Sequence, residues 1–189
     1  MADWARQGWP VIVRRLMAGD TPDSVPAALP LPPDHGKRRV AFSFPSSADL
    51  STLPPVRLRD AARTAPEAWQ TVIARLVELG EAIGAPPRVF GALLWQHVTG
   101  LAYLTARSDL DLLWSCGDEA CVRTLVAGLL RLDADSPVRI DGEVELPDGS
   151  AFNWRELGDG HDDHAVLLKT MNGVEIRAVA ALFQSDASS

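Results

Sequence analysis

The feature that most constrains this chain is an alternation of acidic and apolar residues at positions 108–114, which read Ser-Asp-Leu-Asp-Leu-Leu-Trp. Successive side chains of a β-strand point to opposite faces, so Asp109 and Asp111 share one face and the leucines that alternate with them share the other. The two like charges repel each other unless a cation lies between them, and Mg²⁺ held by carboxylates and substrate phosphates is the usual cation. The alternation therefore predicts a strand with a metal-binding face. An edge strand with two solvated aspartates is the alternative.

The residues before this strand predict a glycine turn followed by a short helix. Residues 88–92 read as a short apolar strand that ends at Gly91-Ala92, and one or two helical turns follow. Strand, glycine turn, helix and an Asp-x-Asp strand, in that order, resemble the nucleotidyltransferase superfamily that includes the β-type polymerases. The resemblance implies that the backbone of Gly91 and Ala92 approaches a phosphate, helped by free amides at the helix start. It also implies that Asp109 and Asp111 hold Mg²⁺ or Mn²⁺ against a triphosphate.

A more specific resemblance extends over most of the chain. It is carried by Gly91 to Gln96 with Thr99-Gly100-Leu101, by Tyr103-Leu104, by residues 108–113, by Gly8-Trp9-Pro10-Val11 with Arg14-Arg15, and by Gly36-Lys37-Arg38-Arg39. These motifs resemble the malonate decarboxylase holo-acyl-carrier-protein synthase family, a group of phosphoribosyl-dephospho-CoA transferases. The resemblance implies transfer of the prosthetic group from 2′-(5″-triphosphoribosyl)-3′-dephospho-CoA to a serine of the apo acyl carrier protein of malonate decarboxylase, with release of pyrophosphate.

The same resemblance implies roles for further residues. The superfamily takes a third carboxylate from a strand beside the Asp-x-Asp strand. Asp141 is the first candidate and Glu143, on the same face of the predicted strand 138–146, is the second. Either would complete the metal site and help take the serine proton, whereas a solvated strand face is the alternative. The candidates for substrate binding are Gly91, Ala92, Ser108, Arg107, Lys37, Arg38, Arg39 and Lys169. Ordinary surface charges and ion pairs are the alternative for the basic ones.

The predicted fold class is α+β, a nucleotidyltransferase-like mixed sheet with helices packed on one side of it, plus a small N-terminal β module. Residues 11–16 and 38–44 predict two strands of the module, and the proline-dense stretch 20–36 predicts an ordered loop or linker. A loop rich in Pro and Ser at 45–56 marks a domain boundary. The module then comprises residues 1–56 and the catalytic domain residues 57–189.

The catalytic domain shows further periodic segments. Helical spacing of apolar residues predicts a helix at 66–84, and Asp118 predicts the N-cap of a second helix that ends near residue 132. Strand 138–146 is expected to form a hairpin with 151–157, and two more strands, 165–169 and 174–183, flank an Asn-Gly turn. The sequence His-Asp-Asp-His at 161–164 lies among glycines and predicts a surface loop in preference to a metal site.

Composition limits the classes of protein to consider. A chain of 189 residues with 47% hydrophobic content can bury a core, and its two cysteines provide neither a disulfide framework nor a zinc site. The net charge of −7 argues against general nucleic-acid binding. Residues 1–64 nevertheless contain nine basic and six acidic residues, which suits contact with a polyphosphate. The sequence has no membrane span or signal pattern, so we expect a cytoplasmic protein.

Two other functions remain open. The first is another nucleotidyl transfer, such as adenylylation, which would use the same aspartates with a different triphosphate. The second is a catalytically silent binding module of the same fold. It is favoured by Ala92, where the superfamily usually has serine, and by the few residues before Gly8-Trp9-Pro10, where family members carry a longer segment.

Overall fold

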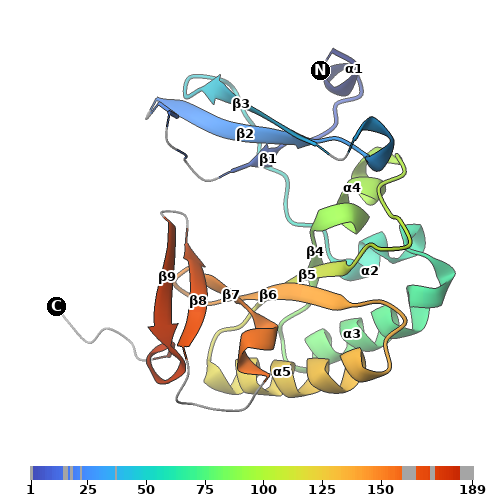
Figure 1. Cartoon of the computed structure of the whole chain (residues 1–189), viewed down its shortest axis with the longest axis vertical. Helices are drawn as coiled ribbons and strands as arrows, with labels where there is room; N and C mark the ends of the chain where they lie inside the picture. Colours follow the sequence, from blue (N-terminus) through green and yellow to red (C-terminus); the bar gives the residue numbers. More distant parts are fainter. Residues whose placement is uncertain are drawn as a thin grey trace.

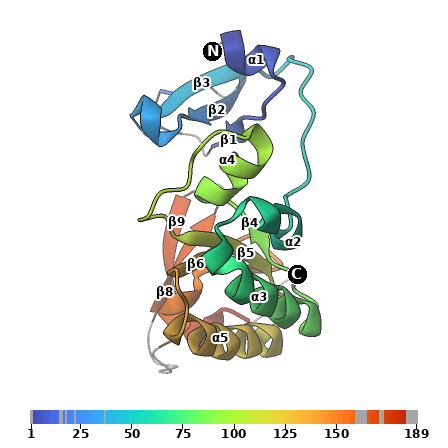
Figure 2. The same cartoon turned by 90° about the vertical axis from the view of Figure 1, so that its right-hand side faces the viewer.

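The protein contains a three-stranded sheet and a six-stranded mixed sheet, with helix α4 (Gly91–Thr99) between them (Figure 1, Figure 2). The computed structural model describes residues 2–14, 17, 19–21, 23–36, 38–158, 165–170 and 173–183. The predicted α+β class, with a mixed sheet and a small N-terminal β module, is confirmed.

The N-terminal sheet is antiparallel, and its central strand lies in the stretch that was predicted as a loop. That prediction was wrong, because β2 (Ser24–Pro30) pairs with β1 (Ile12–Val13) on one side and β3 (Arg39–Pro45) on the other. A proline inside a strand removes a hydrogen-bond donor from the ladder. Here the short β1 pairs only with Ala27 and Ala28, which lie between the prolines of β2. Strand β2 therefore keeps its backbone N–H donors at the positions where it pairs with a strand on each side.

The large sheet has the order β4-β5-β6-β7-β8-β9, in which β5 and β6 are parallel and all other pairs are antiparallel. A parallel pair needs a long crossover, and α5 (Glu119–Ala134) provides it. The side chain of Asp118 accepts a hydrogen bond from the amide of Cys121, so the predicted N-cap is confirmed. The strands are β4 (Arg88–Val89), β5 (Leu110–Ser115), β6 (Ile140–Glu145), β7 (Ala151–Asn153), β8 (Ala165–Thr170) and β9 (Gly173–Ala178).

The main core lies between this sheet and helices α3 (Gln70–Ala82) and α5, which cover one face of the sheet (Figure 1). The predicted helix 66–84 is present but begins with a 3₁₀ turn, Glu67–Trp69, before α3. Burial of the apolar stripes of both helices supplies most of the driving force for this packing. The remaining helical segments are α1 (Ala2–Arg6), α2 (Leu58–Ala61) and the 3₁₀ turns Pro33–His35, Ala62–Thr64, Trp154–Leu157 and Val179–Ala181.

Helix α4 lies on the side of the sheet opposite α3 and α5, which corrects the expectation that helices pack on one side only (Figure 2). Leu93 on this helix enters the main core, whereas Trp95 packs with Trp4 and Leu29 of the N-terminal module in a second cluster. The hydroxyl of Tyr103 also donates to the carbonyl of Pro30 at 2.8 Å. One helix therefore ties the two sheets together.

Two predicted strands are shorter than expected. The segment 151–157 forms β7 and then a 3₁₀ turn, and the segment 174–183 is extended only as far as Ala178. The cluster 161–164 lies outside the described residues. Within the described ranges, no helix is both long enough and apolar enough to cross a membrane.

Candidate active site

The parallel pairing of β5 with β6 places the predicted acids on neighbouring strands. Asp111 lies opposite Asp141 in the register, and Asp109 precedes the first residue of β5. Side chains on this face are half-buried, whereas Leu110, Leu112 and Trp114 on the other face are fully buried. The apolar half of the predicted alternation is therefore confirmed as core, and the three aspartates lie together on the face opposite α3 and α5.

A guanidinium lies between two of these acids. Arg139 donates a hydrogen bond to Oδ2 of Asp109 at 3.0 Å and forms an ion pair with Oδ2 of Asp141 at 3.5 Å. Like charges on adjacent strands destabilise a sheet, and a shared cation offsets their repulsion. The sequence interpretation gave Arg139 no role. Its position two residues before Asp141, on the same strand face, is the signal that points to it.

Asp141 has one oxygen held and one oxygen facing the cluster. Oδ1 accepts from the side-chain amide of Asn153 at 2.9 Å and from the backbone amide of Gly142 at 2.9 Å. Oδ2 faces Arg139. Asn153 lies on β7 opposite Glu143, so its position depends on a strand pairing that the sequence does not specify. Two donors on one oxygen fix the orientation of this carboxylate.

The glycine turn lies directly against Asp111. Gly91 has φ +61°, and a Cβ atom built there would lie 1.8 Å from Oδ2 of Asp111. The amide of Phe90 also donates to the carbonyl of Asp111 at 3.1 Å. Gly91 begins α4, whose first amides have no partner within the helix and favour a nearby negative charge. The backbone of Gly91 and Ala92 and the carboxylate of Asp111 therefore border the same space.

The other acids of β6 are occupied by side chains of neighbouring strands. Glu143 forms an ion pair with Lys169 on β8. Glu145 accepts from Arg88 on β4 at 2.7 Å and from the hydroxyl of Ser115. The structure therefore places Glu143, the second candidate for the third carboxylate, with Lys169, a candidate for phosphate binding, in one pair.

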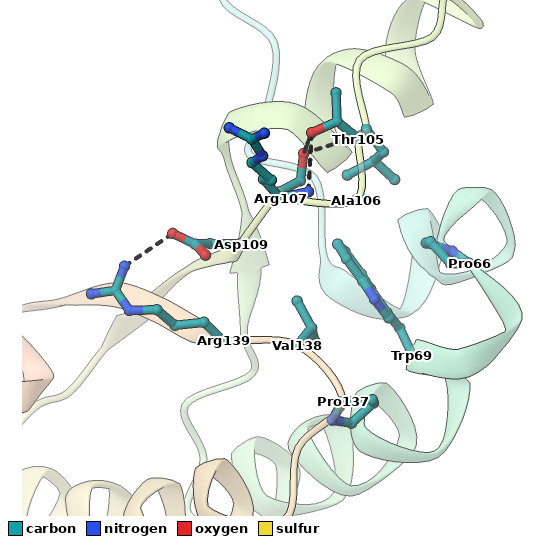
Figure 3. A pocket seen from close by; sticks show the side chains of 11 residues that line it. Pro66, Trp69, Thr105, Ala106, Arg107, Asp109, Pro137, Val138 and Arg139 are labelled. Atoms are coloured by element: carbon teal, nitrogen blue, oxygen red, sulfur yellow. Dashed lines mark hydrogen bonds and ion pairs between the residues drawn. The ribbon is translucent and has the colours of Figure 1, made fainter.

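The turn before β5 is fixed by local hydrogen bonds. The hydroxyl of Ser108 accepts from the amide of Thr105 at 2.9 Å, and the hydroxyl of Thr105 accepts from the amide of Arg107 at 3.3 Å. This turn forms one wall of a pocket of about 480 Å³ beside Asp109 (Figure 3). The pocket is lined by Pro66, Trp69, Leu104, Thr105, Ala106, Arg107, Ser108, Asp109, Pro137, Val138 and Arg139.

The predicted phosphate contacts of the N-terminal module lie in the other sheet. Arg38 and Arg39 are exposed at the start of β3. Lys37 lies outside the described residues. The structure therefore brings together the three aspartates, the glycine turn and the loop that carries Arg107 and Ser108, but it places Arg39 in the separate three-stranded sheet and Arg38 directly before that strand.

The donor set of this cluster fits a divalent metal. Asp109 and Asp141 already face one cation, the Arg139 guanidinium, and carboxylate oxygens are the preferred ligands of Mg²⁺. No three His, Cys, Asp or Glu side chains of the described residues form a ready-made metal site. A Mg²⁺ ion that acts on phosphates needs only one or two protein carboxylates, since phosphates and water supply its other ligands.

Comparison with known proteins identifies the family. The model described as the C-terminal domain of phosphoribosyl-dephospho-CoA transferase MdcG matches residues 57–180, and the model of the N-terminal domain matches residues 1–55. A Xanthomonas campestris pv. campestris protein named phosphoribosyl-dephospho-CoA transferase is 37% identical over 180 residues, which are 95% of this chain and 84% of the relative.

A Bradyrhizobium diazoefficiens protein of the same name is 37% identical over 174 residues, which are 92% of this chain and 76% of the relative. No solved structure matches this chain. Both domain models and relatives that align over nearly the whole chain lead to one conclusion. The chain belongs to the phosphoribosyl-dephospho-CoA transferase family.

Proposed function

We propose that this protein transfers the phosphoribosyl-dephospho-CoA group from 2′-(5″-triphosphoribosyl)-3′-dephospho-CoA to a serine of the apo acyl carrier protein of malonate decarboxylase and releases pyrophosphate. The single observation that carries the proposal is the position of Asp111, against the glycine turn and opposite Asp141. Such an arrangement suits a triphosphate whose oxygens contact helix amides on one side and a metal-binding carboxylate on the other. The names of the relatives supply the substrate class.

Asp109, Asp111 and Asp141 would hold Mg²⁺ or Mn²⁺, which when bound would neutralise charge that develops on the phosphate oxygens. The backbone amides at the start of α4 bind the leaving pyrophosphate, because they lie beside Asp111 and no carbonyl of the helix can accept from them. In this arrangement the chain's own contribution is to orient the triphosphate between the turn and the acids.

Asp141 is the residue that takes the proton of the acceptor serine. Its Oδ1 is held by Asn153 and the Gly142 amide, so Oδ2 is the basic oxygen directed into the cluster. The serine oxygen forms a bond to the α-phosphorus while the bond between that phosphorus and the bridging oxygen of pyrophosphate breaks. The proton passes from the serine hydroxyl to Oδ2 and then to solvent.

Arg139 changes its partner as the donor arrives. Its side chain is 53% exposed and lies between Asp109 and Asp141, the place where a metal would bind. A divalent cation held by these oxygens would repel the guanidinium, and Arg139 would then be free to bind the phosphates of the donor. The long, half-exposed side chain can make this movement at little cost in free energy, since an exposed ion pair contributes at most about 1 kcal/mol to stability.

The test is the intact mass of apo acyl carrier protein after incubation with this protein, Mg²⁺ and the triphosphoribosyl-dephospho-CoA donor. The expected result is a mass gain equal to one phosphoribosyl-dephospho-CoA group, which is absent without donor and absent with chelator. The absence of any gain with a carrier and donor verified by a known transferase would overturn the proposal. A panel of ordinary nucleoside triphosphates would then distinguish adenylyl transfer from a silent binding module.

A further inference from the structure

The pocket beside Asp109 has no role in the chemistry described above. It is bounded by the loop that precedes β5, by the turn that precedes β6, and by the 3₁₀ turn that precedes α3. Figure 3 shows Trp69 on one side of it, Asp109 and Arg139 on the opposite side, and Val138 and Pro137 below. Its volume of about 480 Å³ is within the range of small-molecule sites.

The lining combines fixed apolar surface with two cations. Trp69 is only 7% exposed and Val138 only 8%, so their positions are set by the core and each presents an edge to the pocket. Arg107 and Arg139 are exposed at its rim. A mixed lining, in which apolar side chains lie beside polar ones and guanidinium groups, suits an aromatic base that carries phosphorylated sugar, because guanidinium planes stack on bases and bind phosphate.

The pocket is also aligned with the predicted course of the triphosphate. Gly91 contacts Asp111, Asp109 lies two residues earlier on the same face, and Asp109 lines the pocket. Residues two apart in an extended chain are separated by about 6.6 Å. A triphosphate with its far end at the glycine turn therefore has its sugar end directed to the pocket.

We propose that this pocket binds the adenosine end of the donor, with the adenine between Trp69, Pro137 and the Arg107 guanidinium. The inference rests on the proposed function. In the donor the triphosphoribosyl group is joined to the 2′ oxygen of the adenosine ribose, so a single ribose separates the reacting phosphate from the adenosine. That connection matches a base pocket that shares Asp109 with the acidic cluster.

The experiment measures binding of 3′-dephospho-CoA, without its triphosphoribosyl group, by isothermal titration calorimetry. Ala106→Trp fills the pocket, and Arg107→Met removes the rim cation while keeping most of the side-chain length. We expect each variant to weaken binding about tenfold, the order of one lost base contact. Ala102→Trp, at an exposed position of the same loop outside the pocket, is the matched control and should bind like the wild type. Melting temperatures verify folding, and Arg107→Met keeps the test valid if Ala106→Trp does not fold, since Arg107 is exposed.

Competition identifies which end of the ligand enters the pocket. Adenosine monophosphate should displace 3′-dephospho-CoA, and 4′-phosphopantetheine should not. Displacement by 4′-phosphopantetheine alone, or unchanged affinity in both pocket variants, would overturn the inference. The carrier-protein assay run in parallel separates it from the proposed function. If the wild type transfers the group but the pocket variants bind normally, only the adenosine-site inference is refuted. If binding depends on the pocket but no transfer occurs, only the proposed reaction is refuted.

Discussion

Each end of strand β6 has an acid paired with an arginine, but the two ends differ in how the arginine is held. At the far end, Glu145 binds Arg88 at 2.7 Å and also accepts from Ser115, and both partners of the ion pair are at most 34% exposed. At the near end, Asp141 shares Arg139 with Asp109 at 3.5 and 3.0 Å, and that arginine is 53% exposed. The more buried pair at Glu145 stabilises the sheet, whereas the shared and exposed guanidinium at Asp141 is one that a metal ion can displace.

The pKa of Glu145 supports this difference. Burial alone would raise it, but hydrogen bonds from Ser115 and Arg88 and the charge of Arg88 hold it below its ordinary value. The carboxylate is therefore committed to its charged, paired form, and it joins β4, β5 and β6 at one edge. We interpret the Glu145 end of β6 as structural and the Asp141 end as functional.

The largest expected effect is at the functional end. Asp111→Asn should lower the transfer rate at least about 1000-fold, because it removes a charge from the proposed metal site. Its melting temperature should stay close to that of the wild type, since relief of the repulsion from Asp141 is offset by loss of the attraction between the Asp111 charge and the start of α4. The measurements are pyrophosphate release and thermal unfolding. Glu145→Gln is the matched control, and an equal loss of transfer in that variant would remove the distinction between the two ends.

Two glycines beside the acids offer a second test of the functional end. Gly91→Ala should lower transfer about 100-fold by displacing Asp111, and should destabilise the fold by about 1–2 kcal/mol because of its positive φ. Gly142→Ala should destabilise more, by about 3 kcal/mol, because its Cβ would lie 2.2 Å from the carbonyl oxygen of Leu112 on the adjacent strand, and it should lower transfer to the extent that it moves Asp141, whose Oδ1 the Gly142 amide holds. Denaturant unfolding and transfer rates measure both effects. A Gly91→Ala variant with normal transfer would contradict the role given to the turn.

Removal of the shared cation should strengthen metal binding. In Arg139→Gln, Mn²⁺ no longer competes with a guanidinium for Asp109 and Asp141, so the free protein should bind Mn²⁺ about fivefold more tightly. Titration followed by electron paramagnetic resonance measures the affinity. Arg123→Gln, which removes an exposed ion pair on α5, the helix that covers the opposite face of the sheet, should leave it unchanged. Weaker binding in Arg139→Gln would show that the arginine supports the metal site.

The smallest effect is at the structural end and depends on pH. Glu145→Gln should lower the free energy of unfolding by about 1 kcal/mol at pH 7, or the melting temperature by about 2–4 °C. The folded pKa of Glu145 lies below the ordinary value of 4.5, so the stabilisation is complete above that pH and is lost as pH falls through the folded pKa. Denaturant unfolding of both proteins from pH 7 to pH 3 should show the difference shrink towards zero. A difference that grows on acidification would contradict this assignment.

The sequence predicted those features that local periodicity determines. Alternation identified β5 and its buried face, helical spacing identified α3 and α5, and Asp118 identified a helix start. Proline density misled the prediction at β2, because the sequence does not show that β1 is too short to pair with the prolines. Length and pairing of a neighbouring strand decide whether a proline is tolerated.

The hydrogen-bond and ion-pair partners of the acids could not be predicted from local sequence patterns. Arg139 between Asp109 and Asp141, and Asn153 on Asp141, result from the parallel register of β5 with β6 and the antiparallel register of β6 with β7. Register is set by the packing of whole strands, and a shift of one residue would move every side chain to the other face. The residue types of the site could therefore be predicted from the sequence, but its ion pairs could be identified only in the folded sheet.

The most direct test of the functional end is Mn²⁺ binding in the presence of the triphosphoribosyl-dephospho-CoA donor, followed by electron paramagnetic resonance. We predict that Asp109→Asn and Asp111→Asn each weaken binding at least about tenfold, while Glu145→Gln binds Mn²⁺ like the wild type. Wild-type affinity in both aspartate variants would contradict the account, because the metal would then lie elsewhere and the acidic face of β5 would have only a structural role.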